Sequence, residues 1–194
     1  MFDIPTAPPP PVEFQGKDYI DVPWGWLAVC RMKEETGYKV TVLLGSCVMA
    51  ELSAQIPDGT RVVAYNHFIL PTPSSSHKNF DSPQSIQTIE EGTNRFKIWQ
   101  GEILQFIKGG IETILTLGFS EIPRDQIRAR LFGGKSSLNS FSSGYRNMGV
   151  LRDELHRFGI KIHSCPQGLN ENYSQRFIFD PFTGDYTSTK INTS

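Results

Sequence analysis

The feature that most constrains the fold of this sequence is a hairpin pattern in its first half. Two runs rich in apolar and β-branched residues, Val48–Leu52 and Arg61–Leu70, flank the segment Ile56–Thr60. Within that segment, Pro57-Asp58-Gly59 fits a three-residue hairpin loop, a type I turn followed by a glycine in the left-handed conformation. This loop pairs Ile56 with Thr60. The sequence therefore predicts an antiparallel hairpin of defined register.

The predicted register has a consequence for two reactive side chains. It places His67 opposite Met49 and Cys47 opposite Ile69, so Cys47 and His67 lie on the same face as diagonal neighbours. Their Cβ atoms are then about 7 Å apart, from which an imidazole can reach a thiol. A register shifted by one residue would move His67 to the other face. The placement of Cys47 and His67 on one face therefore depends on the predicted turn type.

The remaining pattern predicts a layered α/β domain with mixed or antiparallel sheets flanked by helices. Residues 72–94 are rich in Ser, Pro and Asn and are expected to form a long irregular loop. Helical spacing predicts one helix over 99–117, with a possible break at Gly109-Gly110, and another over 147–158. The other expected strands cover 20–22, 26–30, 39–44, 127–132, 160–163 and 176–179.

Composition sets the domain limits and excludes several classes of function. Residues 1–16 are expected to be a Pro-rich flexible tail, residues 17–187 one domain, and residues 188–194 a second tail. The net charge is -1, and no Lys/Arg run is long enough for a nucleic-acid footprint. No segment approaches the roughly 18–20 apolar residues of a membrane span, and the N-terminus lacks the features of a signal peptide. We expect a cytoplasmic protein without membrane insertion.

The chain contains three cysteines, Cys30, Cys47 and Cys165, which are widely spaced and form no CxxC pair. This number and spacing argue against a disulfide framework and against a cysteine-based zinc site. The four histidines are scattered, so no metal site and no cofactor are expected. At least one thiol is free, and Cys30 and Cys165 are expected to be structural or surface residues.

Cys47 is the candidate nucleophile, and His67 is its candidate base. Gly45-Ser46 precede Cys47 and would let backbone N–H groups face a reacting carbonyl, as an oxyanion hole requires. Thr41 lies on the preceding strand, and its hydroxyl could hold the far ring nitrogen of His67. We expect His67 to lower the pKa of the Cys47 thiol. On spacing alone, a cysteine on a strand is more often a structural core residue.

Several motifs in this order resemble CheD, the family of chemoreceptor glutamine deamidases. The resemblance covers about residues 17–187, and its most specific part is the combination of Gly45-Ser46-Cys47-Val48 with His67-Phe68-Ile69-Leu70-Pro71. The other motifs are Thr41, Leu131-Phe132-Gly133-Gly134, Arg146-Asn147, Arg176-Phe177-Ile178-Phe179 and Thr183-Gly184.

The resemblance implies a layered α/β fold related to Cys-His deamidating toxins, with Cys47 as nucleophile, His67 as base and Thr41 as orienting residue. Phe132, Gly133 and Gly134 would then lie at the rim of the site. The implied substrates are glutamines, and to some extent glutamate methyl esters, on the cytoplasmic helices of chemoreceptors. The implied regulatory partner is the phosphatase CheC. No cofactor is implied.

The sequence departs from the family pattern around the expected site. Ala64-Tyr65-Asn66 stand where the family usually has glycines, and Pro166-Gln167-Gly168-Leu169 replace its Asp-Val-Gly-Gly segment. Two other functions therefore stay open. One is a non-catalytic binding module that captures a receptor or regulator helix. The other is a toxin-like deamidase or transglutaminase that acts on an unrelated protein.

Overall fold

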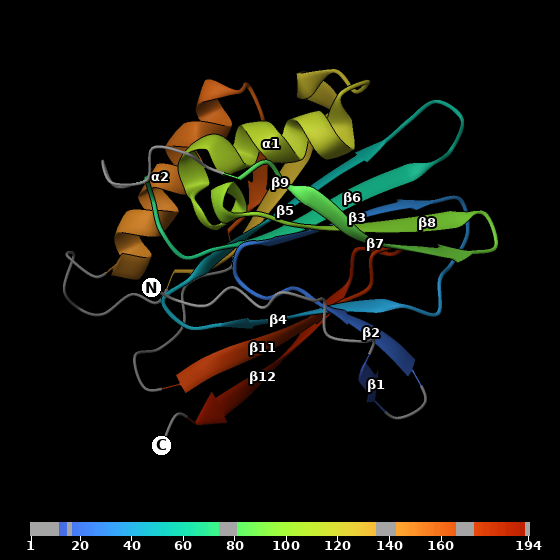
Figure 1. The fold of residues 1–194 in the computed structure, drawn as a ribbon, viewed down its shortest axis with the longest axis horizontal. Coiled ribbons are helices and arrows are strands. Elements are labelled where there is room, and N and C mark those ends of the chain that lie inside the picture. The colour runs from blue at the N-terminus through green and yellow to red at the C-terminus, as the bar shows by residue number, and fades with distance from the viewer. Residues whose placement is uncertain (1–11, 15–16, 74–80, 135–142, 166–172, 193–194) are drawn as a thin grey trace.

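The computed structural model describes residues 12–14, 17–73, 81–134, 143–165 and 173–192, and these residues form three layers (Figure 1). A five-stranded sheet packs against a seven-stranded sheet, and two helices cover the other face of the larger sheet. The predicted fold class, a layered α/β arrangement with mixed sheets, is confirmed.

The five-stranded sheet has the order β1-β2-β4-β11-β12. Strands β2 and β4 are parallel, and the other neighbours are antiparallel. Its strands are β1 (Val12–Phe14), β2 (Lys17–Asp21), β4 (Lys39–Leu44), β11 (Tyr173–Phe179) and β12 (Tyr186–Asn192).

The seven-stranded sheet has the order β10-β9-β5-β6-β3-β8-β7, with only the β10–β9 pair parallel among the described pairs. Its strands are β3 (Trp26–Met32), β5 (Val48–Gln55), β6 (Arg61–Phe68), β7 (Gln84–Glu91), β8 (Asn94–Gln100), β9 (Arg128–Gly133) and β10 (Lys161–Ser164).

Two α-helices and two short 3-10 helices complete the fold: η1 (Glu102–Gln105), α1 (Ile107–Phe119), η2 (Arg124–Gln126) and α2 (Ser143–Arg157). Helix α1 is interrupted in its first turn, where Lys108 and Gly109 have non-helical backbone angles and Gly109 has φ 88°. The predicted break near Gly109-Gly110 is therefore confirmed. A glycine adopts this left-handed angle without the steric cost of a Cβ atom.

Strand alternation along β6 shows how the larger sheet separates two cores. Val62, Ala64 and Phe68 pack under the helices, whereas Val63 and Tyr65 pack between the sheets. All five side chains are at most 1% exposed. Each large apolar side chain buried in this way contributes about 1.5–3 kcal/mol. Burial on both faces explains why β6 is apolar from Val62 to Tyr65 rather than alternating with polar residues.

Residues 72–94 are not the long irregular loop that their composition predicts, because β7 begins at Gln84 and β8 at Asn94. Strand β7 is an edge strand in which only Ile86 and Ile89 pack against the inter-sheet core. An edge strand with so few buried positions gives little hydrophobic alternation. The helix predicted from residue 99 is also wrong at its start, since Trp99 belongs to β8.

Both expected tails contribute strands. Strand β1 pairs with β2, and β12 pairs with β11 over the whole of Tyr173–Phe179. Most of β12 is exposed, so it lacks the apolar pattern by which a buried strand is detected. The ordered fold therefore extends beyond the expected limits at both ends.

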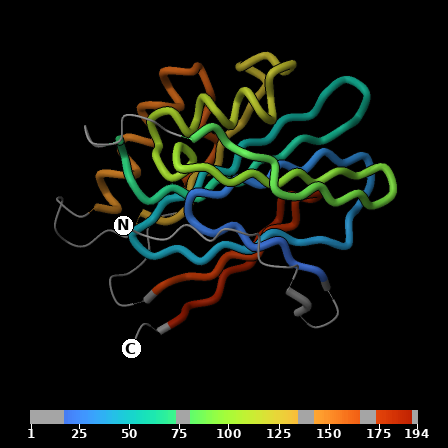
Figure 2. The backbone as a smooth tube through the Cα atoms, viewed as in Figure 1, coloured from blue at the N-terminus to red at the C-terminus, as the bar shows by residue number. Residues whose placement is uncertain are grey.

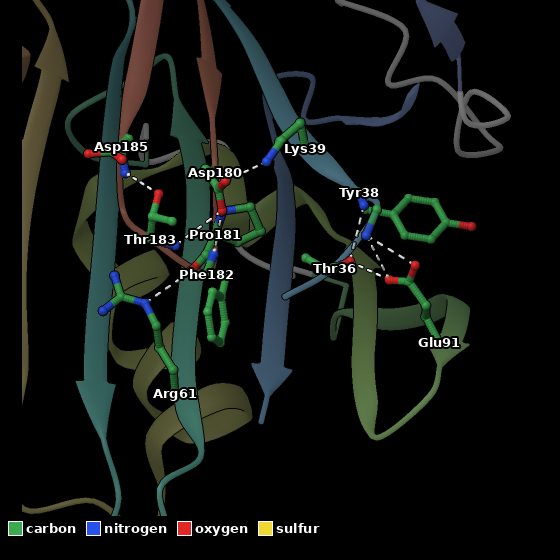
Figure 3. A network of polar contacts seen from close by, with 11 residues as sticks. Thr36, Tyr38, Lys39, Arg61, Glu91, Asp180, Pro181, Phe182, Thr183 and Asp185 are labelled. Atoms are coloured by element: carbon green, nitrogen blue, oxygen red, sulfur yellow. Dashed lines mark hydrogen bonds and ion pairs between the residues drawn. The ribbon is translucent and has the colours of Figure 1, made fainter. Parts of the chain in front are cut away.

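A polar network joins the two sheets at the end where β4 and β6 begin (Figure 3). Asp180 forms an ion pair with Lys39 and accepts hydrogen bonds from the N–H groups of Phe182 and Thr183. Arg61 Nε donates to the Pro181 carbonyl oxygen at 2.9 Å. Burial raises the pKa of the Asp180 carboxyl, but these hydrogen bonds outweigh it and lower the pKa. The opposite ends of β4 and β6 carry the candidate site.

Candidate functional site

The chain passes from the smaller sheet to the larger one between β4 and β5 (Figure 2), and Cys47 belongs to that connection. Strand β4 ends at Leu44, and β5 of the larger sheet begins at Val48. The connection Gly45-Ser46-Cys47 is too short to leave the junction of the two sheets. The Cys47 side chain packs against the inter-sheet core and is partly exposed, whereas Ser46 is exposed. A thiol in this position can contact both the interior and a bound partner.

The hairpin register is the one predicted from the turn. The Ile56 N–H donates to the Thr60 carbonyl at 2.9 Å, and Gly59 has φ 84°. Val48 pairs with Phe68 and Met49 with His67. The partly buried Cys47 packs against the inter-sheet core, and alternation along β6 directs His67 into the same layer as Tyr65. The structure therefore confirms that Cys47 and His67 share one face.

The His67 ring is buried, at 4% exposure, and its two nitrogens have different surroundings. Nδ1 lies 3.2 Å from the carbonyl oxygen of Val22. A carbonyl only accepts, so Nδ1 carries the proton of the neutral ring and Nε2 has a free lone pair. Within the described part of the chain, Nε2 has no hydrogen-bond partner. A buried ring nitrogen left unpaired is costly, and such groups are often functional.

Thr41 is the expected site residue that the structure does not bring to the imidazole. Its neighbours Val40 and Val42 point into the inter-sheet core, so alternation along β4 directs the Thr41 side chain to the other face. The expected hydroxyl contact with His67 is replaced by the Val22 carbonyl. Thr41 acts through its main chain, because its carbonyl accepts the Val22 N–H at 3.0 Å.

The electrostatics differ from the sequence-based expectation. Burial raises the pKa of the Cys47 thiol, and hydrogen bonds from the backbone N–H groups of Cys47 and Gly45 only partly oppose it. Burial also lowers the pKa of His67 to about 4, against the smaller opposing effect of the Val22 carbonyl. The expected lowering of the thiol pKa is therefore wrong. At neutral pH the pair rests as thiol and neutral imidazole.

The Gly133-Gly134 pair holds the Cys47 backbone. Gly133 has φ 83°, pairs with Val48, and leaves no space for a side chain, since a Cβ atom would lie 2.3 Å from the Cys47 carbonyl oxygen. Gly134 donates its N–H to the same oxygen at 2.8 Å. Both glycines therefore contact the Cys47 backbone.

Phe132 is a correction to the expected rim. Its side chain is fully buried in the inter-sheet core, with its ring 4.9 Å from that of Phe179 and 5.4 Å from that of Phe177, centroid to centroid. Alternation along β9 turns the Phe132 side chain toward the smaller sheet. That sheet covers this face of β9 and of its neighbour β5. Phe132 supports the site by packing.

Two positioning contacts were not anticipated. The Val22 carbonyl belongs to the main chain, so no side-chain motif signals it. Asn147 donates from Nδ2 to the Ile69 carbonyl at 3.0 Å and so holds the segment that faces Cys47. The Arg146-Asn147 motif marks Asn147 in the sequence, but the motif alone assigns it no role.

The other thiols differ from Cys47: Cys30 is fully buried, and Cys165 contacts Arg152.

A cysteine that shares one face of a sheet with a neutral imidazole of fixed tautomer can support nucleophilic attack on a carbonyl group. In the described ranges, no group of three or more His, Cys, Asp or Glu residues is placed to hold a metal ion. Nor do those ranges contain a helix that combines the length and the apolar character needed to cross a membrane. The Cys47–His67 arrangement therefore defines the candidate site.

No family model matches the chain. The chain is 29% identical over 155 residues to a protein described as a probable chemoreceptor glutamine deamidase CheD from Janthinobacterium sp. (strain Marseille). The match covers 78% of this chain and 65% of that protein. The chain thus has a distant relationship to CheD and spans less than two thirds of the length of this relative.

Burial of His67 predicts that stability depends on pH. Its pKa is about 4 in the folded protein and 6.5 as the ordinary value, so between these values the unfolded chain binds more protons. Stability from the neutral ring is complete above pH 6.5 and is lost as pH falls toward 4, by about 3 kcal/mol in total. Urea unfolding of wild type and His67→Gln should show this difference between pH 7 and 4.5. An equal pH dependence of both would contradict it; His156→Gln, on an exposed residue of α2, serves as the control.

Proposed function

We propose that this protein hydrolyses glutamine side-chain amides on the cytoplasmic helices of chemoreceptors, and that it acts in the cytoplasm. Cys47 is the nucleophile and His67 the general base. The observation that carries the proposal is the buried His67 ring, whose protonated Nδ1 faces Val22 and whose unpaired Nε2 lies on the same face as Cys47. The distant relationship to CheD supports the choice of substrate.

In the proposed reaction, His67 Nε2 accepts the Cys47 proton while the sulfur attacks the amide carbon. Because the thiol pKa is raised and the imidazole pKa is lowered, the ion pair does not form in advance and proton transfer accompanies attack. Backbone N–H groups of Ser46 and Cys47 stabilise the oxyanion, an effect worth about 3–4 kcal/mol per donor. The imidazolium then protonates the departing ammonia, leaving a thioester.

Water completes the reaction. His67 Nε2 takes a proton from the water molecule as its oxygen attacks the thioester carbon. The tetrahedral intermediate then collapses, which breaks the carbon–sulfur bond, and the sulfur recovers a proton from the imidazolium. The products are a glutamate side chain on the receptor and the free Cys47 thiol. Each proton moves between Cys47, His67, ammonia and water, so the residues present suffice.

The direct test is mass spectrometry of purified receptor cytoplasmic fragments incubated with the protein. A Gln-to-Glu change at defined positions is the expected result. Glutamate methyl esters on the same fragments would be converted to glutamate if esterase activity accompanies deamidation. Fragments that keep all their glutamines after prolonged incubation with the folded protein would overturn the proposal.

A CheC-like phosphatase is proposed as a regulatory partner, on the same relationship. Its test is the deamidation rate with and without that protein.

The two segments in which this chain departs from the family pattern, Ala64-Tyr65-Asn66 and Pro166–Leu169, differ in where they lie. Asn66 is buried and donates to the Trp26 carbonyl at 2.7 Å. The second segment lies outside the described residues.

The role of Thr41 can be tested separately. Since its main-chain carbonyl, and not its hydroxyl, supports Val22, Thr41→Val should leave kcat for deamidation within about twofold of wild type. If the hydroxyl instead orients His67 during turnover, kcat should fall by about 10-fold to 100-fold while KM changes little. Steady-state kinetics on one receptor fragment distinguishes these results.

A further inference from the structure

A cavity of about 280 Å³ lies on the helix-facing side of the larger sheet, at the C-terminal end of α1. Val29, Trp99 and Leu117 form its apolar lining. The last turn of α1 approaches the sheet closely here, because a Cβ atom on Gly118 would lie 3.3 Å from Val29 Cγ2. Trp99 is only 7% exposed. The cavity is therefore formed by tightly packed elements.

The cavity gathers more positive than negative charge. Arg31, Arg95 and Lys97 line it, and Glu121 is the one acidic residue among its lining residues. Arg31 lies directly opposite Arg95 across the β3–β8 pair. Like charges in directly opposite positions of a sheet are destabilising. Glu90 lies directly opposite Arg95 on the other side and forms an ion pair with it at 3.4 Å, and exposure of Arg95 weakens both this attraction and the repulsion from Arg31.

Two of the three cations are positioned for a ligand. Arg31 donates from one terminal nitrogen to the Gly118 carbonyl at 3.2 Å, which anchors a guanidinium that has other N–H donors to offer. Lys97 Nζ lies 5.8 Å from the centre of the Trp99 ring. An anion that enters the cavity would thus meet charged donors beside an aromatic surface.

The volume limits the ligand. An engineered apolar cavity of about 150 Å³ accommodates benzene, so the volume of 280 Å³ is enough for one ring and an attached anionic group. A helix does not fit into such a space. The cavity is also separate from Cys47, since Arg31 lies four residues along β3 from Leu27, about 13 Å away, and Leu27 pairs with Asn66, the residue before His67.

We propose that this cavity binds the oxyanion of a small aromatic phosphate or carboxylate, as a ligand site separate from the Cys47–His67 site. The anion pairs with Arg31, Arg95 and Lys97, and the ring packs against Trp99 and Val29. Binding relieves the repulsion between the opposed arginines. The site does not depend on the proposed deamidase activity.

Isothermal titration calorimetry with phenyl phosphate, benzoate and neutral benzamide tests this site. Phenyl phosphate or benzoate should bind at least 10-fold more tightly than benzamide, and added salt should weaken the binding. The comparison of the two anions shows whether phosphate or carboxylate is preferred. Arg95→Gln and Lys97→Met should each weaken anion binding by about 10-fold or more, whereas Lys161→Met, on an exposed lysine of β10, should not.

Thermal unfolding separates loss of the site from loss of the fold. Without ligand, Arg95→Gln should have a Tm close to that of wild type, because the change removes both the repulsion from Arg31 and the attraction of Glu90. Phenyl phosphate should raise the Tm of wild type and not that of the variant. Benzamide binding as tightly as both anions, or anion binding unchanged in Arg95→Gln and Lys97→Met, would overturn the proposal. Failure of all three probes to bind would also overturn it.

Discussion

Replacement of Cys47 by alanine is expected to reduce deamidation of receptor fragments to the uncatalysed rate, a loss of at least about 10⁴-fold in kcat. The proposed reaction forms a bond to the Cys47 sulfur, and no other thiol can take its place. Cys30 is fully buried within the inter-sheet core, and Cys165 lies beyond β10 in contact with Arg152. The measurement is single-turnover mass spectrometry on one receptor fragment.

His67→Ala should have nearly the same effect, because a nucleophile and its base fail as a unit. The double variant should then be no slower than either single one. Cys165→Ser is the matched control, since it changes a partly exposed thiol outside the site and should keep wild-type kcat. Urea unfolding of each variant at pH 7 shows whether a lost activity reflects the site or the fold.

The same experiment decides between catalysis and binding. The raised pKa of the Cys47 thiol is the observation that favours a binding module, since a resting thiol is a weaker nucleophile than a thiolate. A module that only captures receptor helices would bind them with equal affinity in wild type and Cys47→Ala, and neither would change their mass. That outcome would replace the proposed function.

The part of the site that could be predicted from sequence depends on short-range geometry. The turn at Pro57-Asp58-Gly59 has one compatible register, and that register determines which face His67 occupies. The structure has the same register, so Cys47 and His67 share a face. The Thr41 side chain could not be placed in this way, because β4 belongs to the other sheet and its orientation depends on packing between the sheets.

The two strands that the sequence pattern did not predict, β7 and β12, were missed for the same reason. Strands β7 and β12 are edge strands with few buried side chains, so their sequences contain little hydrophobic alternation. The Val22 carbonyl was missed for a different reason, since a main-chain acceptor has no residue type. The raised pKa of Cys47 was missed as well, because burial is set by two sheets that meet at the Gly45–Cys47 connection.

Gly133→Ala should damage both the site and the stability of the fold. Its added Cβ would lie 2.3 Å from the Cys47 carbonyl oxygen, and the backbone there has φ 83°. The left-handed conformation costs alanine about 1–2 kcal/mol, and overpacking against a fixed backbone adds about 1–3 kcal/mol. The Cys47 backbone must shift to relieve the contact. A displacement of about 1 Å at a reacting group can cost about 100-fold in rate, so kcat should fall by that amount.

Gly59→Ala is the matched control for this prediction. Gly59 has φ 84°, close to that of Gly133, but an added Cβ there meets no atom within 4 Å. It therefore carries the cost of the backbone angle without the contact, and should lose only about 1–2 kcal/mol of stability with kcat unchanged. Urea unfolding and steady-state kinetics of the two variants separate the effects. If Gly133→Ala is no less stable than Gly59→Ala and keeps wild-type kcat, the Gly133 backbone does not position Cys47 for catalysis.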